Sequence, residues 1–151
     1  MLFTGEYERT IDAKERMAVP SEIRSQMDAE RDGTAFYLVP GPNEALWLWP
    51  ERRFEQMAGA MNRSLLPPEE QMEFEELLFP HAHRVELDGN GRVRLPKHML
   101  ERAGLGANVV ILGVRDHLEL RDPEHWRAQQ EQSLAKQREI MLRARRIIGQ
   151  G

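Results

Sequence analysis

The same nine-residue pattern occurs twice in the chain, as DAKERMAVP at residues 12–20 and as DGNGRVRLP at residues 88–96. Both copies follow D-x-x-x-R-Φ-x-Φ-P, where Φ is an apolar residue. Repetition at a fixed spacing indicates two copies of one structural unit. Any fold for this chain must therefore accommodate both copies. The recurring positions are Asp12 with Asp88, Arg16 with Arg92, and Pro20 with Pro96.

The residues that follow each motif extend the repeat. A short helix is predicted after each proline, over 21–27 and 97–103, because proline suits the first turn of a helix. Apolar and β-branched runs then predict two strands in each half. These strands are 36–39 and 46–49 in the first half, and 109–112 and 118–120 in the second.

Each half needs the other to form a core. A unit of about 45 residues buries too little surface to be stable alone. Val85, Leu87, Val93 and Leu95 alternate with charged residues, which gives each strand one apolar face. We therefore predict an α+β fold in which two repeats, related by a pseudo-two-fold axis, form a small β-barrel-like core with flanking helices.

The predicted chain has four segments. These are a first repeat over 5–51, a helical linker over 52–80, a second repeat over 81–124, and a C-terminal helix with a basic tail over 125–151. An amphipathic helix is predicted over 51–62, and an acidic helical stretch after Pro68. The C-terminal segment is predicted to form one long helix over 123–148.

Composition excludes several classes of protein. With 40% hydrophobic and 30% charged residues in 151, the chain has the balance of a globular domain. It has no apolar run of bilayer length and no signal-peptide pattern at its start, so a cytoplasmic location is expected. The absence of cysteine excludes disulfides, thiolate metal sites and cysteine nucleophiles.

Charge is distributed unevenly along the chain. The net charge of −4 does not favour a wholly basic nucleic-acid-binding surface. Seven glutamates against three arginines lie within 51–76, whereas 81–103 has five basic residues against three acidic ones. Six basic residues against two acidic ones lie within 127–151. This basic end could dock on an acidic neighbour, contact phosphate or remain solvated.

The turn in the second motif should be tight. Gly89, Asn90 and Gly91 tolerate positive φ, so the chain can reverse as a hairpin before Arg92. The carboxylate of Asp88 can accept backbone N–H groups and pair with Arg92. Such an ion pair could have only a structural role in stabilising the turn. Alternatively, the two copies of the turn could form a symmetric pair of exposed basic tips with a role in binding. The predicted structural turn residues are Asp12, Pro20, Asp88, Gly91 and Pro96.

Other functional sites have weaker signals. His81 and His83 alternate, which would place both imidazoles on one strand face, but no third metal ligand is defined. No serine–histidine–aspartate spacing, phosphate loop or H-E-x-x-H helix is present, so no enzymatic activity and no cofactor are predicted. Trp47 and Trp49 share one strand face, where core or subunit packing is favoured over a ligand platform.

The motifs together resemble the MraZ family of bacterial transcriptional regulators, which contain two SpoVT/AbrB-type domains. The resemblance covers about residues 1–126 and includes both motif copies with their prolines. It also includes the N-terminal box Phe3-x-Gly5-Glu6-Tyr7 and the late Gly113 and Trp126. It implies a swapped-hairpin fold and sequence-specific binding of double-stranded DNA. It further implies ring-like homo-oligomers on promoter direct repeats, repression of the division and cell wall gene cluster, and association with the nucleoid.

Four basic residues are the candidate DNA contacts. Arg16, with Lys14, is expected to reach base edges, because arginine pairs bidentately with guanine in the major groove. Arg92 and Arg94 are expected to contact phosphates. Glu15 departs from the family pattern, which has glycine there. If that position requires positive φ, glutamate adds strain, and its charge weakens attraction to phosphate.

An alternative function is that of a protein-interaction module. Single AbrB-type domains also serve as antitoxins that bind a partner toxin through a flexible tail. The duplication and the ordered C-terminal helix predicted here are not typical of such antitoxins.

Overall fold

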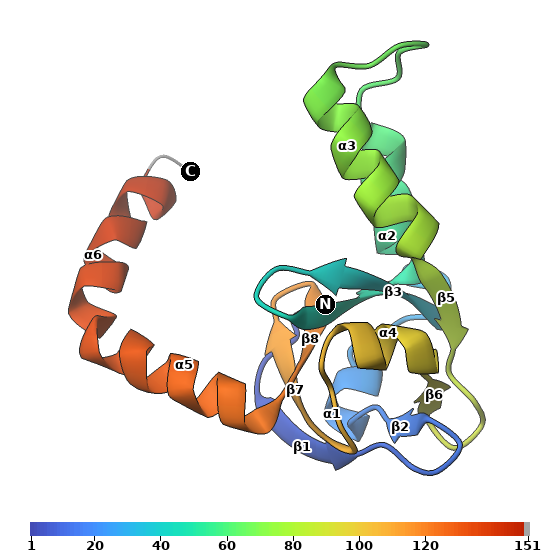
Figure 1. The fold of residues 1–151 in the computed structure, drawn as a ribbon, viewed down its shortest axis with the longest axis vertical. Coiled ribbons are helices and arrows are strands. Elements are labelled where there is room, and N and C mark those ends of the chain that lie inside the picture. Colours follow the sequence, from blue (N-terminus) through green and yellow to red (C-terminus); the bar gives the residue numbers. More distant parts are fainter. Residues whose placement is uncertain (150–151) are drawn as a thin grey trace.

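The computed structural model describes residues 1–149 (Figure 1). Both halves contain the same order of elements, strand–strand–helix–strand–strand, as the repeat predicts. The first half comprises β1 (Glu6–Thr10), β2 (Arg16–Ala18), α1 (Ser21–Arg24), β3 (Ala35–Gly41) and β4 (Ala45–Pro50). The second comprises β5 (His83–Glu86), β6 (Arg92–Arg94), α4 (Lys97–Arg102), β7 (Asn108–Val114) and β8 (His117–Arg121).

The two halves interleave in one antiparallel six-stranded sheet with the order β1-β7-β8-β4-β3-β5. Exchanging the halves, so that β1 becomes β5 and β3 becomes β7, reverses this order and leaves the pairing unchanged. The predicted α+β fold with pseudo-two-fold repeats is therefore confirmed. The sheet is open, with β1 and β5 at its edges.

The predicted tight turn forms in each motif, where the N–H of Asp88 donates to the carbonyl of Arg92 at 2.8 Å and that of Asp12 to the carbonyl of Arg16 at 3.0 Å, but the flanking strands are exchanged between the repeats, as a swapped-hairpin fold implies. The strands that flank the second turn do not pair with each other, since β5 pairs with β3 and β6 pairs with β2 of the other half. In the first half, β1 likewise pairs with β7 and β2 with β6. Each strand buries its apolar face against the other repeat, and local turn signals carry no information about that distant partner.

The core lies between one face of the sheet and a layer formed by α1, α4 and the β2–β6 ladder. Phe36 and Leu48 from the sheet and Met17 and Val93 from the ladder are all fully buried. Ile23 of α1 and Met99 of α4 extend the same cluster. Neither repeat contains a complete core, which is why the two halves cannot separate.

The outer face of the sheet buries charged residues. All five residues of β8 are buried, among them His117, Glu119 and Arg121. Glu119 bridges its neighbours, with Oε1 2.7 Å from Arg121 Nη2 and Oε2 2.9 Å from His117 Nε2. The imidazole stacks on Trp47 and Trp49, with ring centroids 4.3 and 4.4 Å apart. The tryptophans are therefore half-buried packing partners on this outer face.

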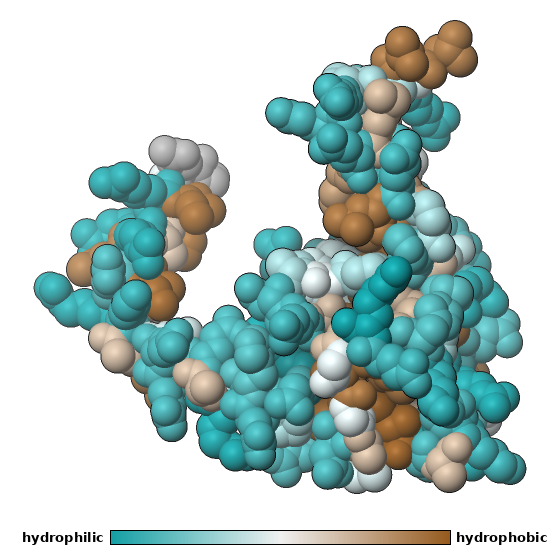
Figure 2. Space-filling model, viewed as in Figure 1, coloured by the Kyte–Doolittle hydropathy of each residue, from teal (hydrophilic) through white to brown (hydrophobic). Residues whose placement is uncertain are grey.

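Two helices between the repeats project from the sheet (Figure 1). They are α2 (Glu51–Ala60) and α3 (Glu69–Leu78), and the 3-10 helix η1 (Phe79–His81) connects α3 to β5. Phe54 of α2 stacks on Tyr37 of β3 with ring centroids 4.7 Å apart. Apolar side chains gather at the far tip of the projection (Figure 2), where Leu65 and Leu66 are exposed.

The C-terminal segment is not the single helix that was predicted. It forms α5 (Pro123–Ala135) and α6 (Gln137–Ile148), separated by Lys136 with φ −110° and ψ 13°. Neither proline nor glycine marks this break, so helix signals in the sequence could not locate it. The last two residues of the predicted 125–151 segment lie outside the described part of the chain. No helix within residues 1–149 is long and apolar enough to cross a membrane.

Candidate nucleic-acid interface

The first turn is organised by one carboxylate. Oδ1 of Asp12 accepts hydrogen bonds from the backbone N–H groups of Lys14 and Arg16, both at 2.9 Å. Its Oδ2 accepts from Nε of Arg16 at 2.9 Å. The backbone N–H of Glu15 closes the turn by donating to the carbonyl of Asp12 at 3.0 Å. This network sets the direction in which the Arg16 side chain leaves the turn.

The second turn repeats this network bond for bond. Oδ1 of Asp88 accepts from the backbone N–H groups of Asn90 and Arg92, and its Oδ2 accepts from Nε of Arg92 at 3.2 Å. The backbone N–H of Gly91 donates to the carbonyl of Asp88 at 3.0 Å. Two chemically different sequences, AKE and GNG, thus adopt one conformation because the flanking aspartate and arginine are the same.

The two turns are joined by reciprocal hydrogen bonds. The carbonyl of Gly91 accepts from the N–H of Val19 at 2.9 Å, and the carbonyl of Glu15 accepts from the N–H of Leu95 at 2.8 Å. Between these bonds, β2 and β6 pair with Arg16 opposite Arg94. The structure therefore brings both motifs together into one two-stranded ribbon.

Three arginines share the outward face of this ribbon. Met17 and Val93 point into the core, so period-two alternation directs Arg16, Arg92 and Arg94 outward. We call these three residues the arginine ladder. The fourth outward position is Ala18, opposite Arg92, so the charge on the ladder is not symmetric.

The carboxylates of Asp12 and Asp88 remain ionised next to the arginine ladder. The backbone N–H of Arg16 is the main cause that holds the pKa of Asp12 below its usual value, and the backbone N–H of Arg92 does the same for Asp88. Within residues 1–149, Nε is the only guanidinium nitrogen of Arg16 that has a hydrogen-bond partner. Its two terminal nitrogens are thus held in place and available to a ligand.

Two further basic residues border the ladder. Lys14 is exposed on the first turn, next to Glu15. Arg24 was not selected from the sequence, yet its guanidinium lies only 2.6 Å from where a Cβ on Gly91 would stand. Its Nε donates to the carbonyl of Val19 at 3.1 Å. The repeat pattern could not identify Arg24, because the equivalent position in the second half is Leu100.

The histidines do not form a site. Of His81 and His83, only His83 lies on a strand; His81 lies in η1, where its Nδ1 is 2.8 Å from the carbonyl of Leu77. The prediction that both imidazoles share a strand face is therefore wrong, because the strand begins two residues later than the alternation suggested. His83 instead packs edge-on against His98, with ring centroids 5.2 Å apart. Residues 1–149 contain no cluster of three or more metal-ligating side chains.

Comparison with known proteins identifies the family. The family model described as "MraZ protein, putative antitoxin-like" matches residues 2–73 and 78–145. The chain belongs to the MraZ family. Proteins named "Transcriptional regulator MraZ" from Roseiflexus castenholzii and Finegoldia magna are 34% and 31% identical to it over 125 residues, which is 83% of this chain and 84% of each relative. The protein of that name from Dehalococcoides mccartyi is 30% identical over 133 residues, 87% of this chain and 90% of its own.

MraZ relatives are named as regulators and not as enzymes, which agrees with the absence of catalytic motifs in the sequence. Glu15 occupies the position in the first turn that Gly91 occupies in the second. Its φ is +60°, and Gly91 at the equivalent position has φ +73°. A turn that the second repeat makes with glycine is thus imposed on a residue with a side chain.

Replacing Glu15 by glycine is expected to stabilise the protein slightly. The left-handed conformation disfavours a residue with a Cβ by about 1–2 kcal/mol. Glycine also has more conformational entropy in the unfolded chain, and this offsets about 0.5–1 kcal/mol of the stability gained by removing the strain. We therefore expect Glu15→Gly to raise the free energy of unfolding in urea by up to about 1 kcal/mol. Glu15→Ala, which removes the charge but keeps the Cβ, should not produce the gain; an equal gain in both variants would assign the effect to charge.

Proposed function

We propose that this protein is a sequence-specific DNA-binding transcriptional regulator that contacts DNA through the β2–β6 ribbon. The observation that carries this proposal is the arginine ladder, which displays three guanidinium groups on one face of a two-stranded antiparallel ribbon. The major groove of B-DNA is wide enough for such a ribbon, and arginine is the commonest side chain to read guanine there.

The four candidate residues take different roles in this proposal. Arg16, helped by Lys14, reads base edges, because Asp12 orients its guanidinium and leaves both terminal nitrogens available. Arg92 and Arg94 supply phosphate contacts, which give affinity without sequence information. The turn residues Asp12, Pro20, Asp88, Gly91 and Pro96 hold the ribbon and do not touch DNA. The net charge of −4 does not oppose this arrangement, because the seven glutamates and three arginines within 51–76, between the repeats, by themselves give a net charge of −4.

The assembly on DNA is part of the proposal. One ribbon offers few contacts, so a ring-like homo-oligomer on promoter direct repeats would raise affinity through effective concentration. In this proposal the two repeats span residues 5–51 and 81–124, and the helical linker 52–80 and the C-terminal segment 125–151 lie outside them. By its membership of the MraZ family, the protein is proposed to repress the division and cell wall gene cluster, in the cytoplasm at the nucleoid.

A salt titration tests the proposal. Binding of the wild type and of Arg16→Ala is measured on a duplex with direct repeats and on a scrambled duplex. We expect the wild type to prefer the repeats, and its log K to fall linearly with log[salt] because bound phosphates release counterions. Arg16→Ala should lose the preference while keeping weak non-specific binding. Equal and weak binding of the wild type to both duplexes near 0.15 M salt, about the physiological value, would refute the proposal.

A second candidate function is supported by the family description, which includes the words "antitoxin-like". In that case the same ribbon would dock a protein partner. The titration separates the two, since a protein-docking ribbon predicts no preference between the duplexes.

A further inference from the structure

The backbone of the β2–β6 ribbon obeys a two-fold axis. Met17 and Val93 hold equivalent positions in the two motifs and pair with each other, so the axis passes between them. The same axis exchanges the two reciprocal hydrogen bonds that join the turns. Both strands also share one burial pattern, which is half-buried, buried and exposed. If the side chains obeyed the axis as well, the ribbon would present the same surface to DNA in either direction.

The arginine ladder breaks this axis at one position. The axis exchanges Arg16 with Arg92, and it exchanges Arg94 with Ala18. Ala18 and Arg94 are both exposed, but only Arg94 is charged. One end of the ladder therefore has two arginines opposite each other, Arg16 and Arg94, whereas the other end has Arg92 opposite an alanine.

The end with two arginines is the stronger site for a hydrogen-bond acceptor. Side chains directly opposite each other in an antiparallel pair stand about 4.5–5.5 Å apart, so two like charges there repel each other. A phosphate oxygen or a guanine edge between them relieves this repulsion and accepts from both. The aspartates of the two turns bond to Arg16 and to Arg92 and not to Arg94. The Arg16 end thus offers DNA a pair of guanidinium groups that the Arg92 end lacks.

We propose that the difference between Arg94 and Ala18 sets the direction in which the ribbon lies on each DNA repeat. This inference rests on the proposed DNA-binding function and deepens it by naming what distinguishes the two ends of the ribbon. Arg16 and Arg92 lie in matching networks, so only their surroundings can give them different roles on DNA. A ribbon with one direction matches a site that is not a palindrome. Copies of such a site that are all read in the same direction are direct repeats.

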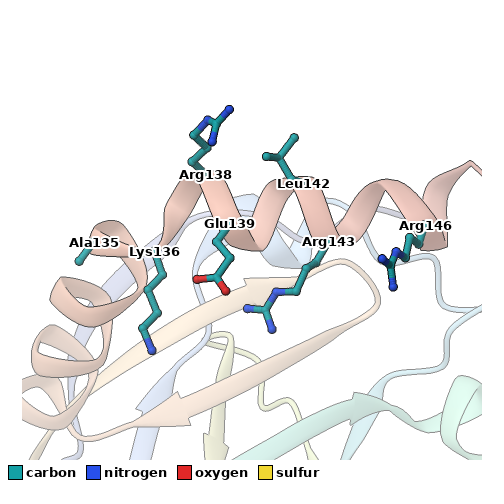
Figure 3. Close-up of a pocket in the computed structure, with 7 residues that line it drawn as sticks. All are labelled: Ala135, Lys136, Arg138, Glu139, Leu142, Arg143 and Arg146. Atoms are coloured by element: carbon teal, nitrogen blue, oxygen red, sulfur yellow. The ribbon is translucent and has the colours of Figure 1, made fainter.

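Two other departures from the axis are rivals for this role. Arg24 borders the second turn and has Leu100 as its equivalent, but its Nε is bonded to the carbonyl of Val19, beside the ladder. The other rival is the basic surface of α6, because α5 and α6 follow the second repeat only. Figure 3 shows Arg143 and Arg146 on this surface. In Figure 1, α6 stands well away from the β2–β6 ribbon.

Directional cleavage of DNA tests the proposal. The chain has no cysteine, so Asn90→Cys gives a single thiol at the exposed second turn, to which an iron chelate that cuts nearby DNA is attached. In the turn network Asn90 donates through its backbone N–H, which the substitution keeps. On a duplex with direct repeats, the labelled protein should cut each repeat on one flank only.

Two variants that restore the axis, made in the labelled background, should lose direction while affinity changes in opposite senses. Ala18→Arg completes a ladder of four arginines, and Arg94→Ala leaves two. Each should cut both flanks about equally. Affinity should rise about tenfold in Ala18→Arg and fall about tenfold in Arg94→Ala, because one arginine contact is worth about tenfold or more. The matched control Ala60→Arg adds the same charge at an exposed position of α2 and should still cut one flank.

The outcomes separate this proposal from its rivals and from the proposed function. A wild type that cuts both flanks, or a restored axis that still gives one flank, would overturn the proposal. So would direction lost in Arg24→Leu, or in Arg143→Ala with Arg146→Ala, but kept in Ala18→Arg. No preference of the wild type for the repeats over a scrambled duplex would refute DNA binding itself, whereas a preference with cutting on both flanks would refute the direction alone.

Discussion

Replacing Glu119 by alanine is expected to lower the free energy of unfolding by about 3–5 kcal/mol, because removing one partner of a buried ion pair leaves uncompensated charge. Here one carboxylate serves two cations, since Arg121 and His117 both donate to it at 2.7–2.9 Å. The Glu119 side chain is only 7% exposed, so water cannot replace the lost acceptor.

Urea unfolding of Glu119→Ala and of Glu86→Ala measures the effect. Glu86 pairs with Arg84 at 2.8 Å but is 70% exposed, so its loss should change stability by no more than about 1 kcal/mol. A loss from Glu119→Ala as small as that of this control would show that the cluster is hydrated and does not stabilise the fold.

The pH dependence of stability should change with the same substitution. Burial alone would lower the pKa of His117, but hydrogen bonds to Glu119 and Asp116 outweigh it and raise the pKa. Because the pKa of His117 is raised, its protonation stabilises the folded state fully at pH values below the unfolded pKa of about 6.5. This stabilisation is lost as the pH rises through the pKa of the folded state. Burial alone would raise the pKa of Glu119, yet hydrogen bonds from His117 and Arg121 lower it. The ionised Glu119 carboxylate therefore stabilises the folded state, and this stabilisation is lost as the pH falls through the folded pKa. Glu119→Ala should therefore flatten both limbs of the wild-type profile.

The joint reversal of Arg16→Glu and Arg94→Glu is expected to weaken binding to the direct repeats by about a hundredfold or more. The two residues are opposite each other in the β2–β6 register, so both reversals fall on one patch of the ladder. Each arginine contact is worth about 1–3 kcal/mol, and a carboxylate at the same place repels phosphate.

The matched control is Arg52→Glu with Arg63→Glu, which makes the same change in net charge on the α2–α3 side of the molecule. It should change affinity far less and should keep the wild-type melting temperature, whereas the variant with Arg16→Glu loses the Arg16–Asp12 pair and should melt slightly lower. Equal losses in the two would mean that net charge, and not the arginine ladder, governs DNA binding.

Local sequence patterns predicted most of the helices and strands of this fold, but not how the strands pair with one another. Apolar and β-branched runs located β3, β4, β7 and β8, and each proline marked the start of a short helix, although α1 ends at Arg24 and not at 27. The break at Lys136 was missed, because nothing in the local sequence interrupts helix formation there. The buried cluster around Glu119 was also missed, since charged residues in a strand usually indicate a solvent-facing side.

The sequence by itself determined the duplication, the α+β class, the aspartate–arginine turns and the MraZ family, because these depend on residues close together in the chain. Only the tertiary structure decided the register in which the motif strands of the two repeats pair, which sets Arg16 opposite Arg94 and brings Arg24 to the second turn. Burial of both apolar faces in one shared core selects that pairing. It is a property of the two halves together, and neither turn encodes it alone.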